Sequence, residues 1–274
     1  HIFTFNNTGC AGIAYNTTGP LNGNATTLVL YTSVQSGAWN DAATWDLNAV
    51  PTFANDVVIA NGHTVTVNAA TANGAVTTIN SGGTLVVSGS TLNIASLNNS
   101  GTVTASGGTL YVSGAATSGI TNNSGENFTV SGSTIYLGPA GGSNRTFTNN
   151  GTLAVSSGTL TINGNYKQIT STGTLTQSGG DIVIDGNAAG VLVNSVGTGT
   201  YLFQAGTSGA SVTSSTFNLS GGTITIVDPH ASTTSTYALY VYTSTNFSAT
   251  GTHTFKFGDG VSTDAGGSTN GLYI

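Results

Sequence analysis

Residues 151–164 read Gly-Thr-Leu-Ala-Val-Ser-Ser-Gly-Thr-Leu-Thr-Ile-Asn-Gly. Two short runs of alternating apolar residues, Leu153/Val155 and Leu160/Ile162, flank a Ser-Ser-Gly corner in this stretch. Alternation with a period of two residues predicts β-strands, because successive side chains face opposite sides of a strand. Serine and glycine at the corner favour a tight bend of the backbone. The stretch therefore predicts two strands joined at a corner.

The same phrase occurs six times, and the second run always begins seven residues after the first. The second runs lie 18, 25, 25, 22 and 42 residues apart. Such a period is typical of solenoids, in which each repeat forms one coil. A hairpin would favour Asn-Gly or Asp-Gly turns, which these corners lack. We therefore expect an all-β, parallel β-solenoid, right-handed as parallel β connections usually are. The two runs begin at Leu85/Leu92, Val103/Leu110, Phe128/Ile135, Leu153/Leu160, Leu175/Ile182 and Phe217/Ile224.

A serine follows the first run of every copy, three residues after the first apolar residue. Stacking of the coils would align these serines in one column along a corner of the solenoid. We expect this column to act as a structural ladder that stabilises the stack. Its members are Ser88, Ser106, Ser131, Ser156, Ser178 and Ser220.

The composition excludes two classes of partner. Only 4% of the 274 residues are charged, with three Lys or Arg against nine Asp or Glu and a net charge of −6. Nucleic acids and anionic membranes are bound through clusters of Lys and Arg, which this chain lacks. We expect no nucleic-acid partner. The sequence also has no apolar run of about 18 residues that could span a bilayer.

The chain divides into three segments by composition. Residues 36–230 carry the repeats and are expected to form the solenoid. Residues 1–35 are expected to cap its N-terminal end, and residues 231–274 to form a C-terminal β cap or an assembly segment, because an open end exposes apolar core and unpaired strand edges. Apolar residues near both termini are candidate assembly strands that pair with a neighbouring copy. These residues are Ile2, Phe3, Phe5, Leu272, Tyr273 and Ile274.

Residues 36–68 contain the most distinctive sequence motif of the chain. They include Ser36-Gly37-Ala38-Trp39-Asn40-Asp41-Ala42-Ala43-Thr44-Trp45, then Val50-Pro51, then Asp56-Val57-Val58-Ile59 and Gly62-His63-Thr64-Val65-Thr66-Val67. This sequence resembles the β-helical repeat regions of secreted and surface proteins of Bacteroidota, an adhesin-like family associated with type IX secretion. The resemblance implies an extracellular or cell-surface location. The chain begins at His1 without a signal segment, so we expect an exported protein whose N-terminal signal has been removed.

Trp39 and Trp45 are the two tryptophans of the chain. The main interpretation is that both fill the first coil, because each buries a large apolar area. The alternative is that they stack on a sugar ring.

Catalysis is not expected. Asp181 and Asp185 lie on one face of a strand, but no His, Arg or third acid lies close to them in the sequence. Solvated turn acids are therefore a better interpretation than a glycosidase pair. His230 and His253 lack the spacing of zinc ligands, so we expect no metal and no cofactor.

These observations predict a non-enzymatic, extracellular β-solenoid that serves as a structural or adhesive surface element and assembles with copies of itself into a filament or fibre. Nearly uncharged copies would not repel one another, and coil ends are natural head-to-tail contacts. The alternatives are a monomeric carbohydrate-binding adhesin that recognises a polysaccharide or another glycan and, less favoured, a polysaccharide-degrading β-helix enzyme.

Overall fold

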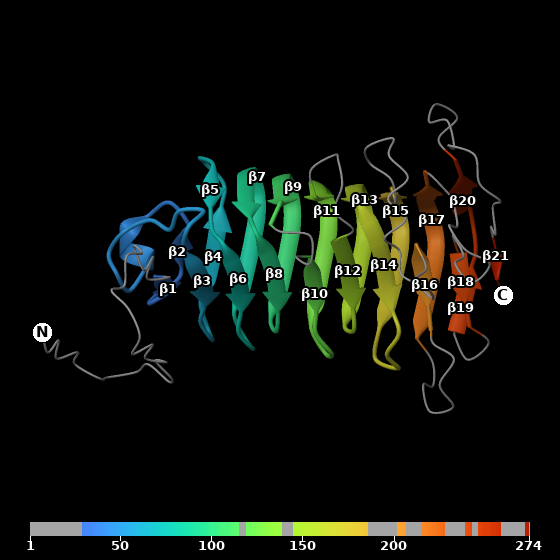
Figure 1. Ribbon diagram of the computed structural model, residues 1–274, viewed down its shortest axis with the longest axis horizontal. Coiled ribbons are helices and arrows are strands. Elements are labelled where there is room, and N and C mark those ends of the chain that lie inside the picture. Colours follow the sequence, from blue (N-terminus) through green and yellow to red (C-terminus); the bar gives the residue numbers. More distant parts are fainter. Residues whose placement is uncertain are drawn as a thin grey trace, which may run out of the picture.

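The computed structural model describes residues 29–114, 119–138, 145–185, 202–206, 215–227, 239–242, 246–258 and 272–273. These residues form an elongated parallel β-solenoid in which coil follows coil along the long axis, from blue to red in Figure 1. The expected fold class is confirmed: the described strands form two sheets, and every pair of neighbouring strands is parallel.

The first sheet, here the long-strand sheet, contains six strands of 11 residues each. Each of them carries one copy of the repeated phrase, and shorter strands continue the sheet at both ends. Its members are β2 (Gly37–Ala38), β4 (Thr64–Val67), β5 (Ala72–Asn73), β7 (Thr84–Ile94), β9 (Thr102–Val112), β11 (Asn127–Leu137), β13 (Thr152–Ile162), β15 (Thr174–Ile184), β17 (Thr216–Ile226), β19 (Asn246–Ala249) and β20 (Thr254–Phe257).

The second sheet, here the short-strand sheet, is built from strands of two to five residues that alternate with the long ones along the chain. One short 3-10 helix, η1 (Ala42–Thr44), lies in the first described coil. The strands of the sheet are β1 (Leu30–Thr32), β3 (Asp56–Ile59), β6 (Val76–Ile79), β8 (Ser96–Asn99), β10 (Ile120–Asn122), β12 (Arg145–Asn149), β14 (Gly164–Gln168), β16 (Phe203–Ala205), β18 (Leu239–Val241) and β21 (Leu272–Tyr273).

Register in the long-strand sheet follows the repeated phrase. Leu153 pairs with Phe128 on one side and with Leu175 on the other, and Leu160 pairs with Ile135 and Ile182. The pairing shifts at the corner between the two runs. Because one face of the sheet is buried, a slip of one residue would turn the whole apolar set outward, and the register is strongly specified.

The core lies between the two sheets, and its composition changes along the axis. Leu and Val dominate the inward positions of β7 and β9. From β11 onward, aromatic rings pack in succession: the ring centroids of Phe128 and Phe147 are 5.4 Å apart, those of Phe147 and Tyr166 5.9 Å, and those of Tyr166 and Phe203 4.9 Å. Such contacts stabilise the core beyond the area that the rings bury.

The segment expected as the C-terminal cap continues both sheets where it is described. β18 pairs with β16, β21 pairs with β18, and β19 and β20 both pair with β17. All of these pairings are parallel, so the last described coil has the same strand direction as the coils before it.

Candidate functional site

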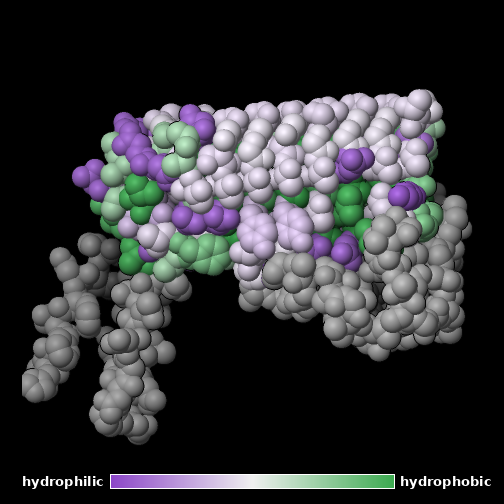
Figure 2. Space-filling model, turned by 90° about the horizontal axis from the view of Figure 1, so that it is seen from above, coloured by the Kyte–Doolittle hydropathy of each residue, from purple (hydrophilic) through white to green (hydrophobic). Residues whose placement is uncertain are grey.

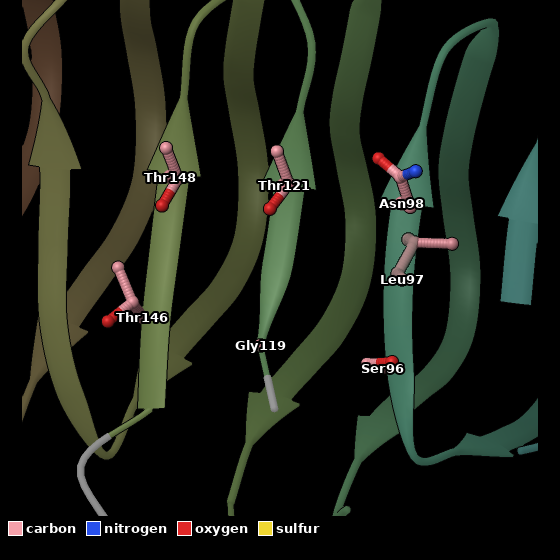
Figure 3. Close-up of a pocket in the computed structure, with 7 residues that line it drawn as sticks. All are labelled: Ser96, Leu97, Asn98, Gly119, Thr121, Thr146 and Thr148. Atoms are coloured by element: carbon pink, nitrogen blue, oxygen red, sulfur yellow. The ribbon is translucent and has the colours of Figure 1, made fainter. Parts of the chain in front are cut away.

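A hollow of about 300 Å³ lies on the outer face of the short-strand sheet, over β8, β10 and β12. Figure 3 shows that its side chains come from these three neighbouring strands and its backbone from Gly119, the residue before β10. We call this site the β8–β12 hollow. Its lining residues are Ser96, Leu97, Asn98, Gly119, Thr121, Thr146 and Thr148.

Strand register arranges the outward residues of the hollow in a row across the sheet. Asn98 pairs with Thr121, Thr121 pairs with Thr148, and Thr148 pairs with Lys167 on β14. Figure 3 shows Asn98, Thr121 and Thr148 at similar levels on their three strands, which run side by side. Neighbouring strands are about 4.8 Å apart, so the row presents an amide and two hydroxyls at regular intervals along the rod.

Gly119 opens the second row of the hollow, between Ser96 and Thr146. The Gly119 carbonyl accepts a hydrogen bond from the Leu97 amide at 3.0 Å. A Cβ atom at Gly119 would overlap the Thr146 carbonyl oxygen. The close approach of the two strands therefore requires glycine here, and the missing side chain leaves space at the floor of the hollow.

Two side chains of the hollow are held by neighbours outside it. The Asn123 amide donates to Asn98 Oδ1 at 2.8 Å, and Thr146 Oγ1 donates to Asn165 Oδ1 at 2.6 Å. These bonds fix the orientation of the Asn98 amide and of the Thr146 hydroxyl. Asn98 Nδ2 is therefore directed away from Asn123 and can donate to a ligand, and the Thr146 hydroxyl oxygen can still accept a hydrogen bond.

A buried ladder of amide side chains runs beneath this face. Asn99 Nδ2 donates to Asn122 Oδ1 at 2.7 Å, Asn122 Nδ2 to Asn149 Oδ1 at 2.9 Å, and Asn149 Nδ2 to Gln168 Oε1 at 2.8 Å. Each of the four is the last residue of its strand in the short-strand sheet. We call this set the amide ladder.

The amide ladder also binds the backbone of the long strands. Asn149 Nδ2 contacts the Thr174 carbonyl at 2.9 Å, and Gln168 Nε2 donates to the carbonyls of Gly173 and Thr216 at 3.0 Å each. A fully satisfied buried network of this kind rigidifies the structure. It fixes the ends of β8, β10 and β12, one residue beyond the outward row of the hollow.

Tyr166 completes the amide ladder. Its hydroxyl donates to Gln168 Oε1 at 2.6 Å and lies 3.2 Å from Asn149 Nδ2. Burial raises the pKa of Tyr166, and the hydrogen bond from Asn149 opposes that shift only in part. The phenol is therefore the neutral, donating form that the Gln168 oxygen requires.

Arg145 at the start of β12 is buried behind the hollow, with 2% of its surface exposed. Its Nη1 donates to the carbonyl of Gly114. Burial lowers the pKa of Arg145, and the neighbouring Tyr111 acts in the opposite direction. Tyr111 stacks on Tyr136 with centroids 5.4 Å apart and planes 11° from parallel. This cation is thus not presented to a ligand in the hollow.

The six corner serines occupy equivalent positions in the repeated phrase, but the register shifts at the corner, so that Ser88 pairs with Gly107 and Ser178 with Gly221 rather than with the next serine. Their side chains do not face the core. Ser131 is half-buried and the others are exposed. The close stacking contacts are made by their backbone carbonyls instead. Carbonyl oxygens of Ser88 and Ser220 lie 2.6 Å from where Cβ atoms of Gly107 and Gly251 would stand. Equivalent close contacts join Ser106 with Gly132, Ser156 with Gly179 and Ser178 with Gly221.

Both tryptophans are buried, Trp39 at 0% and Trp45 at 2% exposure. Their rings meet edge to face with centroids 5.2 Å apart. Trp39 Nε1 donates to the Asn73 carbonyl at 3.2 Å, and Trp45 Nε1 to the Trp39 carbonyl at 2.8 Å. Stacking on a sugar requires an exposed ring face, which neither tryptophan offers, so this interpretation is corrected: both rings fill the first coil.

The candidate assembly strands are described only in part. Ile2, Phe3, Phe5 and Ile274 lie outside the described residues. Leu272 and Tyr273 form β21, which pairs in parallel with β18 of the same chain and is the outermost described strand of the short-strand sheet.

Asp181 faces solvent on β15, where its neighbours on the adjacent coils are Thr159 and Thr223 rather than further acids. Asp185 follows the end of that strand. Among the described residues, no three His, Cys, Asp or Glu side chains gather closely enough to hold a metal ion. Nor does the described part of the chain contain a helix of the length and apolarity needed to cross a membrane.

Sequence reasoning missed the amide ladder, the close contacts of the corner glycines with the neighbouring coil, and the hollow. One signal for the ladder was present: Asn99-Ser-Gly-Thr102 and Asn149-Asn-Gly-Thr152 repeat an asparagine three residues before the threonine that opens a long strand. Asparagine beside glycine also marks turns, so the pattern alone does not separate an inward amide from a turn residue.

Comparison with curated proteins and with solved structures found no match to this chain. One family model does match it, that of the G8 domain, over residues 44–176. The matched part begins in η1, ends in β15, and includes the whole β8–β12 hollow. Across just under half of its length, from Thr44 to Thr176, the chain is therefore similar to G8 domains.

Proposed function

We propose that this protein is an extracellular structural or adhesive β-solenoid whose copies associate end to end. The parallel β-solenoid and the match to the G8 domain, which is typical of extracellular proteins, support the structural or adhesive role. Figure 2 shows rows of pale residues of intermediate hydropathy over the middle coils, with strongly hydrophilic groups gathered mainly at one end, and only 4% of the residues of the chain are charged. Such a surface suits close packing of many copies, because little charge must be desolvated.

The observation that carries end-to-end association is the exposure of apolar side chains on the two terminal coils. In the first described coil, Leu30 is 51% exposed and Val34 53%. In the last, Phe247 is 36% exposed and Phe257 45%. Within the described residues, these coils also carry the outermost strands of each sheet, β1 and β2 at one end and β19, β20 and β21 at the other. Stacking one end on the other would continue the parallel pairing that joins every coil to the next.

The charges of the two terminal coils are complementary. Asp41 and Asp46 are exposed in the first coil, and Lys256 is exposed on β20 in the last. Lys256 is the one charged residue among those described in the last coil, residues 239–242, 246–258 and 272–273. Opposite charges favour head-to-tail over head-to-head contact, and a head-to-tail contact that does not close produces an open filament.

Sedimentation velocity across a range of protein concentrations tests this association, with electron microscopy of the concentrated sample. We expect concentration-dependent assembly and filaments. Phe257→Asp, which places a charge in the apolar end, should shift assembly to at least tenfold higher concentration. Val76→Asp is the matched control, because Val76 is 44% exposed on β6, away from both ends. A protein that stays monomeric at all concentrations, or equal effects of both variants, would contradict the proposal.

The protein is, in this proposal, non-enzymatic and is exported by a member of the Bacteroidota through type IX secretion. The sequence motif of residues 36–68, which resembles that family, supports the source and the export route. The non-enzymatic character is supported by the threonines that flank Asp181 on the adjacent coils, where a glycosidase would need a second acid. Incubation with neutral and acidic polysaccharides, followed by measurement of reducing ends and of unsaturated products, should detect no turnover.

A further inference from the structure

The β8–β12 hollow has the chemistry of a carbohydrate site. We propose that it binds a neutral, linear glycan that lies along the solenoid axis across β8, β10 and β12. This inference rests on the adhesive part of the proposed function and names its ligand class and its site; it does not depend on end-to-end association.

The lining of the hollow selects against charged and apolar ligands. None of its seven residues is charged, and five of them, Ser96, Asn98, Thr121, Thr146 and Thr148, end in a hydroxyl or an amide. The one apolar residue, Leu97, is 2% exposed and turns its side chain to the core. A ligand gains little here from apolar burial or from charge pairing, but it meets groups that both donate and accept hydrogen bonds. Sugar hydroxyls, which also do both, are the matching chemistry.

The geometry favours an extended ligand. The outward row Asn98–Thr121–Thr148 runs from strand to strand, so its polar groups recur about every 4.8 Å along the rod. That repeat is comparable to the length of one sugar residue in a linear chain. A volume of about 300 Å³ is at the lower limit typical of small-ligand sites. The hollow therefore seats a short part of a chain that continues along the sheet, toward β6 on one side and past Lys167 of β14 on the other, where the ammonium group can donate hydrogen bonds to sugar hydroxyls.

The site is preorganised on both faces of the sheet. Asn123 and Asn165 orient the polar groups of Asn98 and Thr146 from the side. The amide ladder fixes the strand ends from beneath through Asn99, Asn122 and Asn149. A rigid site loses little conformational entropy on binding, which favours measurable affinity even when the contacts are only hydrogen bonds.

Affinity electrophoresis of the full chain tests the proposal, with soluble mannan, β-glucan, dextran and arabinoxylan each cast in a native gel. We expect at least one of these neutral polysaccharides to retard the protein. Thr121→Val/Thr148→Val keeps the side-chain shape and removes two hydroxyls. Each hydroxyl is worth about two- to tenfold in affinity, so the double variant should lose about fourfold to a hundredfold.

The matched control is Thr104→Val/Thr129→Val, which removes two outward hydroxyls from a register pair on β9 and β11 of the long-strand sheet. It should bind like the wild type, and thermal unfolding should show that both double variants are folded. Three results would overturn the proposal: no retardation by any neutral polysaccharide, equal loss in both double variants, or retardation only by alginate or pectin that salt abolishes. Sedimentation of the same samples reports on end-to-end association separately, so failure of one inference is distinguishable from failure of the other.

Discussion

The two sheets are formed by the same coils and enclose the same core, yet their strands differ in length and regularity. Six strands of the long-strand sheet have 11 residues each and repeat one phrase in register. Strands of the short-strand sheet have two to five residues and carry both the hollow and the amide ladder. The difference indicates that the long-strand sheet keeps the coils in register, whereas the short-strand sheet tolerates the variation in length and sequence that a binding site requires.

The two sheets also use buried amides differently. Gln168 in the short-strand sheet belongs to the amide ladder and meets partners on several coils. Gln177 in the long-strand sheet occupies a position filled by Val155 and Leu219 on the neighbouring coils, and its buried Oε1 has no hydrogen-bond partner. One amide is integral to its sheet, while the other substitutes for an aliphatic residue.

The largest expected effect comes from exchanging these amides for leucine. Gln168→Leu leaves the buried Tyr166 hydroxyl without its acceptor, whereas Asn149 keeps its bond to the Thr174 carbonyl and the Gly173 carbonyl keeps its bond from the Thr216 amide. One unsatisfied buried group costs about 1–3 kcal/mol and each further hydrogen bond lost about 1 kcal/mol, so we expect a loss of about 3 kcal/mol in the free energy of unfolding. Gln177→Leu, the matched control, should change it by about 1 kcal/mol or less, because the orphaned oxygen disappears along with two hydrogen bonds. Urea denaturation measures both. Equal losses would remove the proposed distinction between the sheets.

The corner of the long-strand sheet provides the next test. Gly179→Val places a Cβ atom against the Ser156 carbonyl of the preceding coil, and we expect a loss of about 2–3 kcal/mol from this overpacking. Ser178→Ala alters the exposed serine next to it and should change stability by about 0.5 kcal/mol or less. Thermal and urea unfolding compare the two. If the serine proved the more sensitive residue, its hydroxyl rather than the glycine contact would hold the corner.

A smaller, pH-dependent effect is expected from Tyr166 in the amide ladder. The unfolded chain loses the phenolic proton near pH 10, whereas burial raises the pKa of Tyr166 in the folded protein. The unfolded state therefore binds fewer protons than the folded state above pH 10. The contribution of Tyr166 to the free energy of unfolding is fully present below that pH and falls by about 1.4 kcal/mol per pH unit as the pH rises above it.

Tyr166→Phe should remove this part of the slope, although it also lowers stability at pH 7 by loss of the bond to Gln168. Urea unfolding of the wild type and of Tyr166→Phe at several pH values between about 9 and 11.5 measures this difference in slope. Parallel stability curves for the two proteins would show that Tyr166 does not resist ionisation in the folded state.

The sequence predicts the long-strand sheet well because its phrase combines alternation with a fixed spacing. Leu153 and Leu160 lie where the pattern places them, paired with their counterparts on both neighbouring coils. The sequence predicted the corner through its serines, whereas the close contacts at the corner join serine carbonyls to glycines of the next coil. A backbone carbonyl leaves no mark on the type of residue that bears it, so the sequence does not show these contacts.

The short-strand sheet was much less accessible to sequence analysis. Strands as short as β10, with three residues, carry too few side chains to show a period. The inward role of Asn122 and the space left by Gly119 depend on which coil lies next to which, and connections of varying length between the repeats hide that register. The candidate site therefore became visible only once the coils were stacked.

Parallel stacking of successive coils underlies both the division between the sheets and the proposed site, and thiol cross-linking measures it most directly. Cys10→Ser removes the one cysteine of the chain and provides a background without thiols. In this background, Thr134→Cys/Thr159→Cys places two cysteines directly opposite each other on the neighbouring strands β11 and β13. A bifunctional thiol reagent spanning about 5 Å should bridge them. Thr129→Cys/Thr134→Cys, on either side of one corner of β11, should remain unbridged. Bridging of the second pair and not of the first would mean that each phrase folds back on itself as a hairpin, and would contradict the stacked solenoid.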